Sequence, residues 1–101
     1  MIARLWRGVA KPNFAEVYVD HLRTATIPVL QQLSGFVDAS ILRRSVPEGV
    51  EFLVVTRWVS LESIRAFAGT AIEDAVVPQN VRAMMVEYDS IVRHYEEVGP
   101  E

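Results

Sequence analysis

The segment FLVVTRWVSLESIRAFAG (residues 52–69) contains a strand, a corner and a helix in succession. Its first half is rich in branched and aromatic residues, which favour strands. Ser60 is a good helix N-cap, and Gly69 suits the left-handed position that ends many helices. We therefore predict a strand over residues 50–59 that turns at Trp58 into a helix ending at Gly69.

The other elements are predicted outward from this corner. Residues 36–45 form a strand, and the turn sequence VPEG (46–49) joins it to residues 50–59 as a hairpin. The remaining predicted elements are a strand at residues 2–9, a helix from Pro12 to Leu33 that kinks or restarts at Pro28, a helix from Pro78 to Met85 and a strand at residues 88–98. Residues 70–77 carry no clear pattern, and no element is assigned to them.

The order strand, helix, strand, strand, helix, strand corresponds to two split βαβ units. This order predicts an α+β, ferredoxin-like βαββαβ fold with an antiparallel 4-1-3-2 sheet and helices on one face. The strands at residues 36–45 and 50–59 show little polar alternation, and half of all residues are hydrophobic. Both faces of the sheet are therefore expected to be covered. We predict a homodimer that packs sheet to sheet as a dimeric α+β barrel.

Composition limits the classes of protein that fit. The 101 residues suit one domain spanning residues 1–101. The net charge of −3 and the scattered basic residues give no footprint for nucleic acid or an anionic membrane. The absence of cysteine excludes disulfides, thiolate nucleophiles and cysteine-based zinc sites, and it predicts a cytoplasmic location. Two histidines without cysteine make a poor metal site, so no metal is expected.

Three motifs resemble those of the antibiotic biosynthesis monooxygenase family of small dimeric α+β barrels. The motifs are RLWRG (4–8), TRWVSLESIRAFAG (56–69) and VRHYEEV (92–98), and the resemblance covers nearly the whole chain. Its best-understood branches oxidise polycyclic phenols with molecular oxygen and no cofactor, or degrade haem. The resemblance therefore implies the fold predicted above and an oxygenase activity.

The resemblance also specifies where haem-degrading members carry their key residues. They use an asparagine in the first strand, a tryptophan in the helix after the third strand and a histidine further on. Aligned through Trp58, these positions are Trp6, Phe67 and Val77. Valine cannot ligate iron, so haem degradation of that type is not expected here.

Antiparallel pairing in the predicted sheet places the start of the first strand beside the ends of the third and fourth. This brings Arg4, Trp58 and His94 to one end of the sheet, and the first helix carries Tyr18 and His21 back toward it. The candidate catalytic residues are His21 or His94 as the base and Arg4 as the group that holds an anion. The candidate substrate-binding residues are Trp6, Tyr18, Trp58 and Phe67.

Each candidate also has a purely structural interpretation. Trp58 is typical of a core residue at a corner, and His21 of a core histidine with a hydrogen-bond partner. His94 is equally compatible with a hydrogen-bonded strand position or a dimer contact. Arg4 and Trp6, two residues apart on one face, fit a simple cation–π pair.

Two functions follow from these residues. The first is a cofactor-independent monooxygenase that oxidises an electron-rich cyclic aromatic or phenolic molecule with O2. The alternative is a non-catalytic dimeric α+β barrel, either a small-molecule-binding protein that uses the same space between helices and sheet or a regulatory protein. The expected partners are a second copy of the chain and a small aromatic ligand, with no nucleic acid and no membrane.

Overall fold

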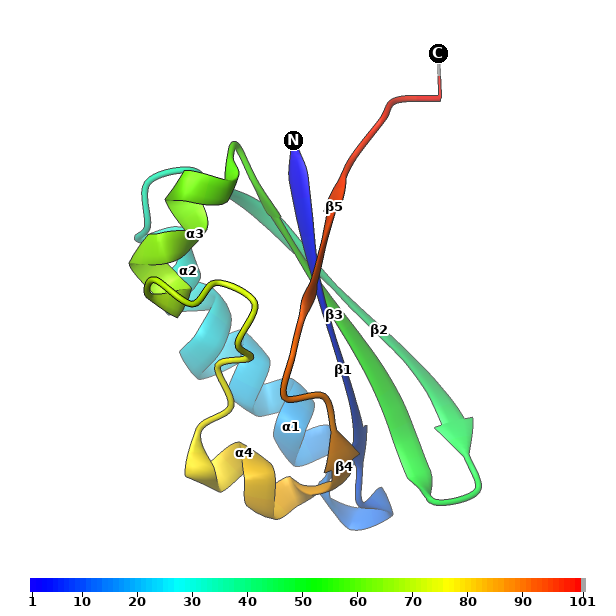
Figure 1. The fold of residues 1–101 in the computed structure, drawn as a ribbon. Helices are drawn as coiled ribbons and strands as arrows, with labels where there is room; N and C mark the ends of the chain where they lie inside the picture. Colours follow the sequence, from blue (N-terminus) through cyan, green and yellow to red (C-terminus); the bar gives the residue numbers. More distant parts are fainter. Residues whose placement is uncertain (101) are drawn as a thin grey trace.

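The computed structural model describes residues 1–100, in which helices pack against one face of an antiparallel sheet (Figure 1). The elements are β1 (Ile2–Ala10), η1 (Pro12–Phe14), α1 (Ala15–His21), the π-helix η2 (Leu22–Thr26), α2 (Ile27–Gln31), β2 (Phe36–Val46), β3 (Gly49–Trp58), α3 (Leu61–Ala68), α4 (Gln79–Met84), β4 (Met85–Tyr88) and β5 (Arg93–Glu96). The strand order is β2-β3-β1-β4, and β5 also pairs with β1. The predicted ferredoxin-like fold and its sheet order are confirmed.

The last strand differs from its prediction over residues 88–98, because residues 89–92 separate β4 from β5. The backbone of this gap pairs with the unassigned loop: Ala75 N–H donates to Ser90 C=O, and Val92 N–H donates to Glu73 C=O. The helix predicted to Met85 ends at Met84, and Met85 begins β4. Both boundaries therefore depend on partners that lie far away in the sequence.

The first helical region breaks before Pro28, as predicted. Proline has no N–H to donate to the carbonyl four residues earlier, so the regular helix cannot continue through it. The chain forms the π-helix η2 instead, and Ile27 N–H reaches back to Leu22 C=O. A π-turn inside a helix is frequently found at functional sites.

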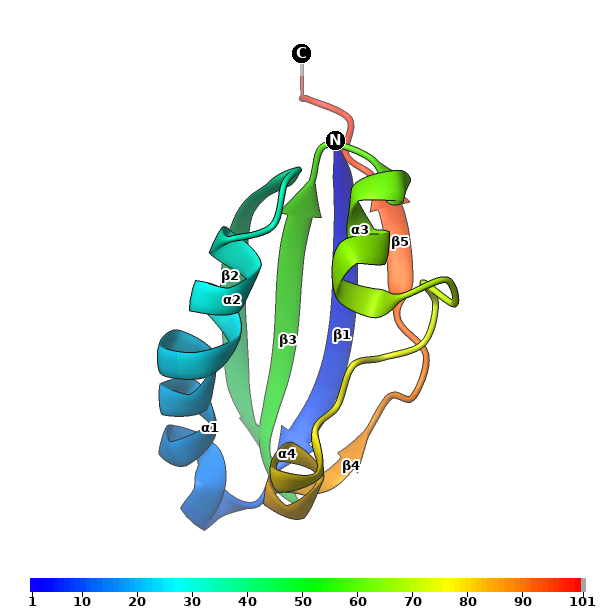
Figure 2. The same ribbon diagram turned by 90° about the vertical axis from the view of Figure 1, so that its left-hand side faces the viewer.

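The core between helices and sheet has two centres. Phe52 and Tyr18 meet edge to face, with 5.0 Å between ring centroids, in the first cluster. Leu30, Trp58 and Ile64 are fully buried in the second. Figure 2 looks onto the helical side and shows α1 and α2 along one edge of the sheet, and α3 and the loop before α4 along the other.

The opposite face of the sheet carries no helix (Figure 1). Side chains alternate between faces along a strand, so Leu5 and Leu53 point to this open face while their neighbours Arg4 and Val54 point to the helices. Among the described residues, no helix is long and apolar enough to cross a membrane.

Candidate functional site between the sheet and the helices

A cavity lies between the two core clusters, with about 670 Å³ of space counting its open mouth. The sheet supplies one wall, the α1–η2–α2 helical region a second, and the segment before α4 a third. The lining residues are Arg4, Trp6, Tyr18, His21, Leu22, Thr26, Ile27, Leu30, Ala39, Val54, Thr56, Phe67, Val76, Val77, Pro78, Val81 and Val92. Most of these side chains are aliphatic or aromatic, which is typical of small-molecule sites.

Arg4 is the cation of the sheet wall, and only 4% of its surface is exposed. Its guanidinium donates to the backbone carbonyls of Ile72 and Asp74, the latter from Nη2 at 2.9 Å. No carboxylate within residues 1–100 forms an ion pair with it. Burial lowers the pKa of Arg4 to about 10, and the nearby charge of Glu73 opposes this shift. Arg4 is therefore a charged group at neutral pH whose charge is only partly compensated.

His94 lies beside Arg4 and does not line the cavity. Its Nε2 is 2.9 Å from Arg4 Nη1. Because a guanidinium has only donors, Nε2 must accept this bond, which assigns the neutral imidazole with its proton on Nδ1. Burial, and then the charge of Arg4, lower the pKa of His94. The geometry thus uses His94 to hold the guanidinium of Arg4.

Tyr18 and His21 are the polar side chains one turn apart on the helical wall. Their rings stack with 6.4 Å between centroids. Neither side chain donates or accepts a hydrogen bond within residues 1–100, and both residues line the cavity. No fully buried side-chain nitrogen or oxygen there lacks a partner, so the polar atoms of Tyr18 and His21 are not fully enclosed by protein. Burial raises the pKa of Tyr18 far above its ordinary value. Its hydroxyl therefore stays neutral and can donate.

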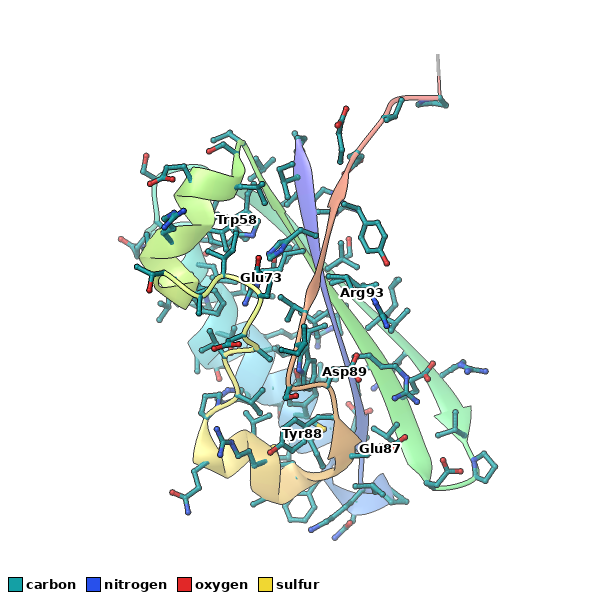
Figure 3. The ribbon with its side chains drawn as sticks, in the orientation of Figure 1. Trp58, Glu73, Glu87, Tyr88, Asp89 and Arg93 are labelled. Carbon is teal, nitrogen blue, oxygen red and sulfur yellow. The ribbon has the colours of Figure 1, made fainter. Side chains whose placement is uncertain are left out.

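Trp6 forms the surface between Arg4 and Tyr18. Its Nε1 donates to the carbonyl of Asp89 at 2.9 Å, which fixes the indole plane. The ring centroids of Trp6 and Tyr18 are 6.0 Å apart. Asp89 lies at the turn between β4 and β5 (Figure 3). The interruption of the last strand thus provides the acceptor that orients one wall of the cavity.

Trp58 packs in the core and does not line the cavity. The residue is 0% exposed, and its Nε1 donates to Thr56 Oγ1 at 2.9 Å. Figure 3 shows it between α3 and the sheet. Phe67 stacks on it at 6.3 Å between centroids and lies with its ring 5.8 Å from the guanidinium carbon of Arg4. Of this pair, Phe67 forms the wall and Trp58 supports it.

The structure thus brings five of the seven candidate residues onto one cavity: Arg4, Trp6, Tyr18, His21 and Phe67. It places His94 behind Arg4 and Trp58 behind Phe67. The candidates from sequence did not include Thr26 of η2, Thr56 of β3 or Val76, and Val77 was named only as an aligned position of the haem-degrading branch. The antiparallel pairing of β1 with β3 would have found Thr56, which lies opposite Arg4. The loop carries no such periodic signal.

This arrangement defines a class: a ferredoxin-like α+β domain with an apolar small-molecule cavity between its helices and its sheet. The sequence profile of the antibiotic biosynthesis monooxygenase family matches residues 1–77. The chain belongs to that family. No curated protein matches the sequence.

Solved structures show the same fold at low sequence identity. A candidate antibiotic biosynthesis monooxygenase from Bacillus cereus is 18% identical, with a TM-score of 0.65 over 99% of this chain and 93% of its own. The haem degrader MhuD from Mycobacterium tuberculosis, solved with two haems in its active site, is 20% identical, with a TM-score of 0.61 over 100% of this chain and 99% of its own. A MhuD variant with two manganese protoporphyrins bound per active site is 19% identical, with a TM-score of 0.63 over 100% of this chain and 98% of its own.

Proposed function

We propose that the protein is a cofactor-independent monooxygenase that oxidises an electron-rich aromatic or phenolic molecule with O2. Its membership in a monooxygenase family supports an oxidoreductase. The observation that carries the proposal is the cavity. Within residues 1–100, a buried cation without an ion pair and a histidine without a hydrogen-bond partner line one apolar space. Binding, deprotonation and shielding from water are the tasks that such chemistry requires of a protein.

In the proposed reaction His21 takes a proton from the bound aromatic. Arg4 stabilises the resulting anion, and the neutral hydroxyl of Tyr18 donates a hydrogen bond to it. An electron-rich carbanion or phenolate can pass an electron to O2 without a metal or flavin. For a ring CH2 group, one oxygen atom ends as a carbonyl on that carbon. The other leaves as water with the two hydrogens, so atoms and electrons balance. Trp6 and Phe67 hold the ring system.

Haem does not fit the residues in the manner of the haem-degrading branch. The three positions that the resemblance aligns, Trp6, Phe67 and Val77, do all line the cavity. The side chain at the ligand position, Val77, has no donor atom for iron. The histidine on the cavity, His21, lies on the helical wall instead. We therefore derive no step through haem.

The proposed activity is tested by O2 uptake and product analysis with a panel of anthrones and naphthols. Removal of a general base typically costs about 10²- to 10⁴-fold in rate. We expect His21→Ala to lose turnover by this factor, while Asp20→Asn, on the adjacent exposed position of α1, retains it. Turnover that survives His21→Ala unchanged would exclude His21 as the base.

A second candidate function is non-catalytic binding of a small molecule in the same cavity. The replacement of all three haem-branch positions, by Trp6, Phe67 and Val77, favours it. Saturable binding of panel compounds without O2 uptake from any of them would establish this second function in place of the first.

We also propose that a second copy of the chain covers the open face of the sheet. Leu42 and Tyr95 are 51% and 50% exposed on that face. Glu51 on the same face is paired with Arg7 and Arg44, with both Nε–carboxylate distances 2.7 Å. These three charged groups are thus compensated within one chain, which lowers the cost of burying them against a partner.

A further inference from the structure

We propose that the cavity takes a hydroxylated aromatic carboxylate, whose ionised carboxyl group pairs with Arg4 while its hydroxyl faces Tyr18 and His21. This inference rests on the proposed function, because it names the substrate class of the same cavity. In this refinement Arg4 holds the carboxylate of the ligand rather than the anion that forms on deprotonation. The anion at the hydroxylated, reacting end is then stabilised by the hydroxyl of Tyr18 alone.

The first argument is the hydrogen-bond inventory of Arg4. A guanidinium has five N–H donors in a planar fork. Three of them are directed to Ile72 C=O, Asp74 C=O and His94 Nε2. The Nε–H and one of the two Nη2–H groups donate to no atom within residues 1–100, and Nε and Nη2 are neighbouring nitrogens on one edge of the guanidinium. An adjacent pair of this kind matches the two oxygens of a carboxylate.

The second argument is charge. All three partners of Arg4 are neutral, since two are backbone carbonyls and the third is an imidazole accepting through Nε2. Glu73 is the acidic residue whose charge raises the pKa of Arg4. It is exposed and forms no ion pair with Arg4. A buried charge is costly unless an opposite charge meets it. A carboxylate is ionised throughout the neutral range, so it compensates Arg4 on binding, whereas an uncharged phenol does not.

The third argument is the composition of the remaining wall. Trp6 and Phe67 offer aromatic surfaces next to Arg4, and Val54 and Val92 complete an apolar lining for a planar ring. Arg4 is the one charged residue among the lining side chains, all of which lie within the described chain. The site therefore matches one negative charge on an otherwise apolar body, with hydroxyl chemistry at the helical wall.

The test compares matched ligands on the intact protein by titration calorimetry at pH 7.5. The probes are 6-hydroxy-2-naphthoate, its uncharged carboxamide and 2-naphthol. We expect the carboxylate to bind at least about tenfold more tightly than the carboxamide, because the carboxylate brings an opposite charge to Arg4 and can form two parallel hydrogen bonds, whereas the carboxamide offers one neutral acceptor. Arg4→Met should reduce the affinity for the carboxylate to the level of the carboxamide and leave the carboxamide little changed.

Arg93→Gln is the matched control, because it removes an arginine from the neighbouring strand β5 without reaching the cavity. Figure 3 shows Arg93 directed away from the helices. If Arg4→Met does not fold, the inference is still tested by comparing the affinities of the wild-type protein for the carboxylate and the carboxamide. Equal affinity for carboxylate and carboxamide overturns the inference.

O2 uptake separates this inference from the proposed function. Uptake with 2-naphthol and no preference for the carboxylate overturns the inference and supports the oxygenase. Selective binding of the carboxylate without O2 uptake supports the inference and overturns the oxygenase.

Discussion

The contact between Arg4 and His94 shows how one side chain sets the state of another. Arg4 offers only donors, so His94 must present a lone pair and remain neutral. In return, His94 Nε2 and two loop carbonyls hold the guanidinium beside the cavity. His94 therefore holds the guanidinium of Arg4 in place, and His21 is the histidine that lines the cavity. The assignment separates two histidines that were equivalent candidates in the sequence.

The lowered pKa of His94 predicts how stability depends on pH. The folded pKa lies below the unfolded value of about 6.5, so the unfolded chain binds more protons between the two values. The stabilisation is complete above about pH 6.5 and decreases as pH falls through the folded pKa. We expect the stability advantage of wild type over His94→Gln to shrink between pH 7.5 and 5, measured by urea unfolding. Arg93→Gln should show no such change, and a parallel shift in both variants would contradict the assignment.

At the scale of elements, the cavity exists because several regular elements are interrupted. Pro28 forces the π-helix η2, whose Leu22 and Thr26 line the helical wall. The break between β4 and β5 supplies the Asp89 carbonyl that orients Trp6. A continuous helix and a continuous last strand would use these backbone groups in their own regular hydrogen bonds. The η2 wall and the bond from Trp6 to Asp89 would then not form. The site is thus built from the departures from ideal geometry.

The connection from α2 to β2 provides a test of element packing. Gly35 has φ +89°, and a Cβ added there would lie 2.4 Å from Ser63 Cβ in α3. Gly69 has φ +78°, but an added Cβ would meet nothing within 4 Å. With ψ −163°, Gly69 is not in the left-handed helical region predicted for it but in a region essentially limited to glycine. The backbone strain of placing another residue there costs on the order of 1–3 kcal/mol.

We therefore expect Gly69→Ala to lose about 1–3 kcal/mol of unfolding free energy and Gly35→Ala to lose more, because it adds a steric clash to the strain. Urea denaturation monitored by tryptophan fluorescence gives both values. Equal losses would show that α3 moves away from residue 35 freely.

At the scale of the whole molecule, the sheet has one covered and one open face. The covered face contains both core clusters and the cavity, whereas the open face carries half-buried aliphatic residues between compensated charges. An apolar sheet face of this kind is expected to be covered in solution. A second copy would leave the cavity on the outer side of each sheet.

Light scattering on the purified chain is expected to give twice the 11.4 kDa mass of one copy at micromolar concentration. Leu53→Glu places a charge in the centre of the open face and should shift the mass toward one copy. Val29→Glu is the control, since Val29 is exposed on α2 at the helical side. A monomeric wild type would exclude the proposed dimer.

Much of the fold follows from local sequence pattern. The hairpin around VPEG, the N-cap at Ser60 and the break at Pro28 depend on neighbours in the chain, so the order of elements and the antiparallel sheet were predictable. Antiparallel pairing then placed Arg4 opposite His94 and Trp58 opposite Ile2 at one end of the sheet.

Local pattern is therefore sufficient to predict the order of the elements and which of their ends meet. Which side chains face the cavity depends on how the elements pack. Trp58 and Thr56 lie on one face of β3, yet helix packing buries Trp58 and leaves Thr56 on the wall. The backbone carbonyls that hold Arg4 come from a loop without periodicity. The physical reason is that sequence periodicity indicates only whether a residue is buried or exposed. The hydrogen-bond or packing partner of a buried group depends on strand register and on segments distant in the chain.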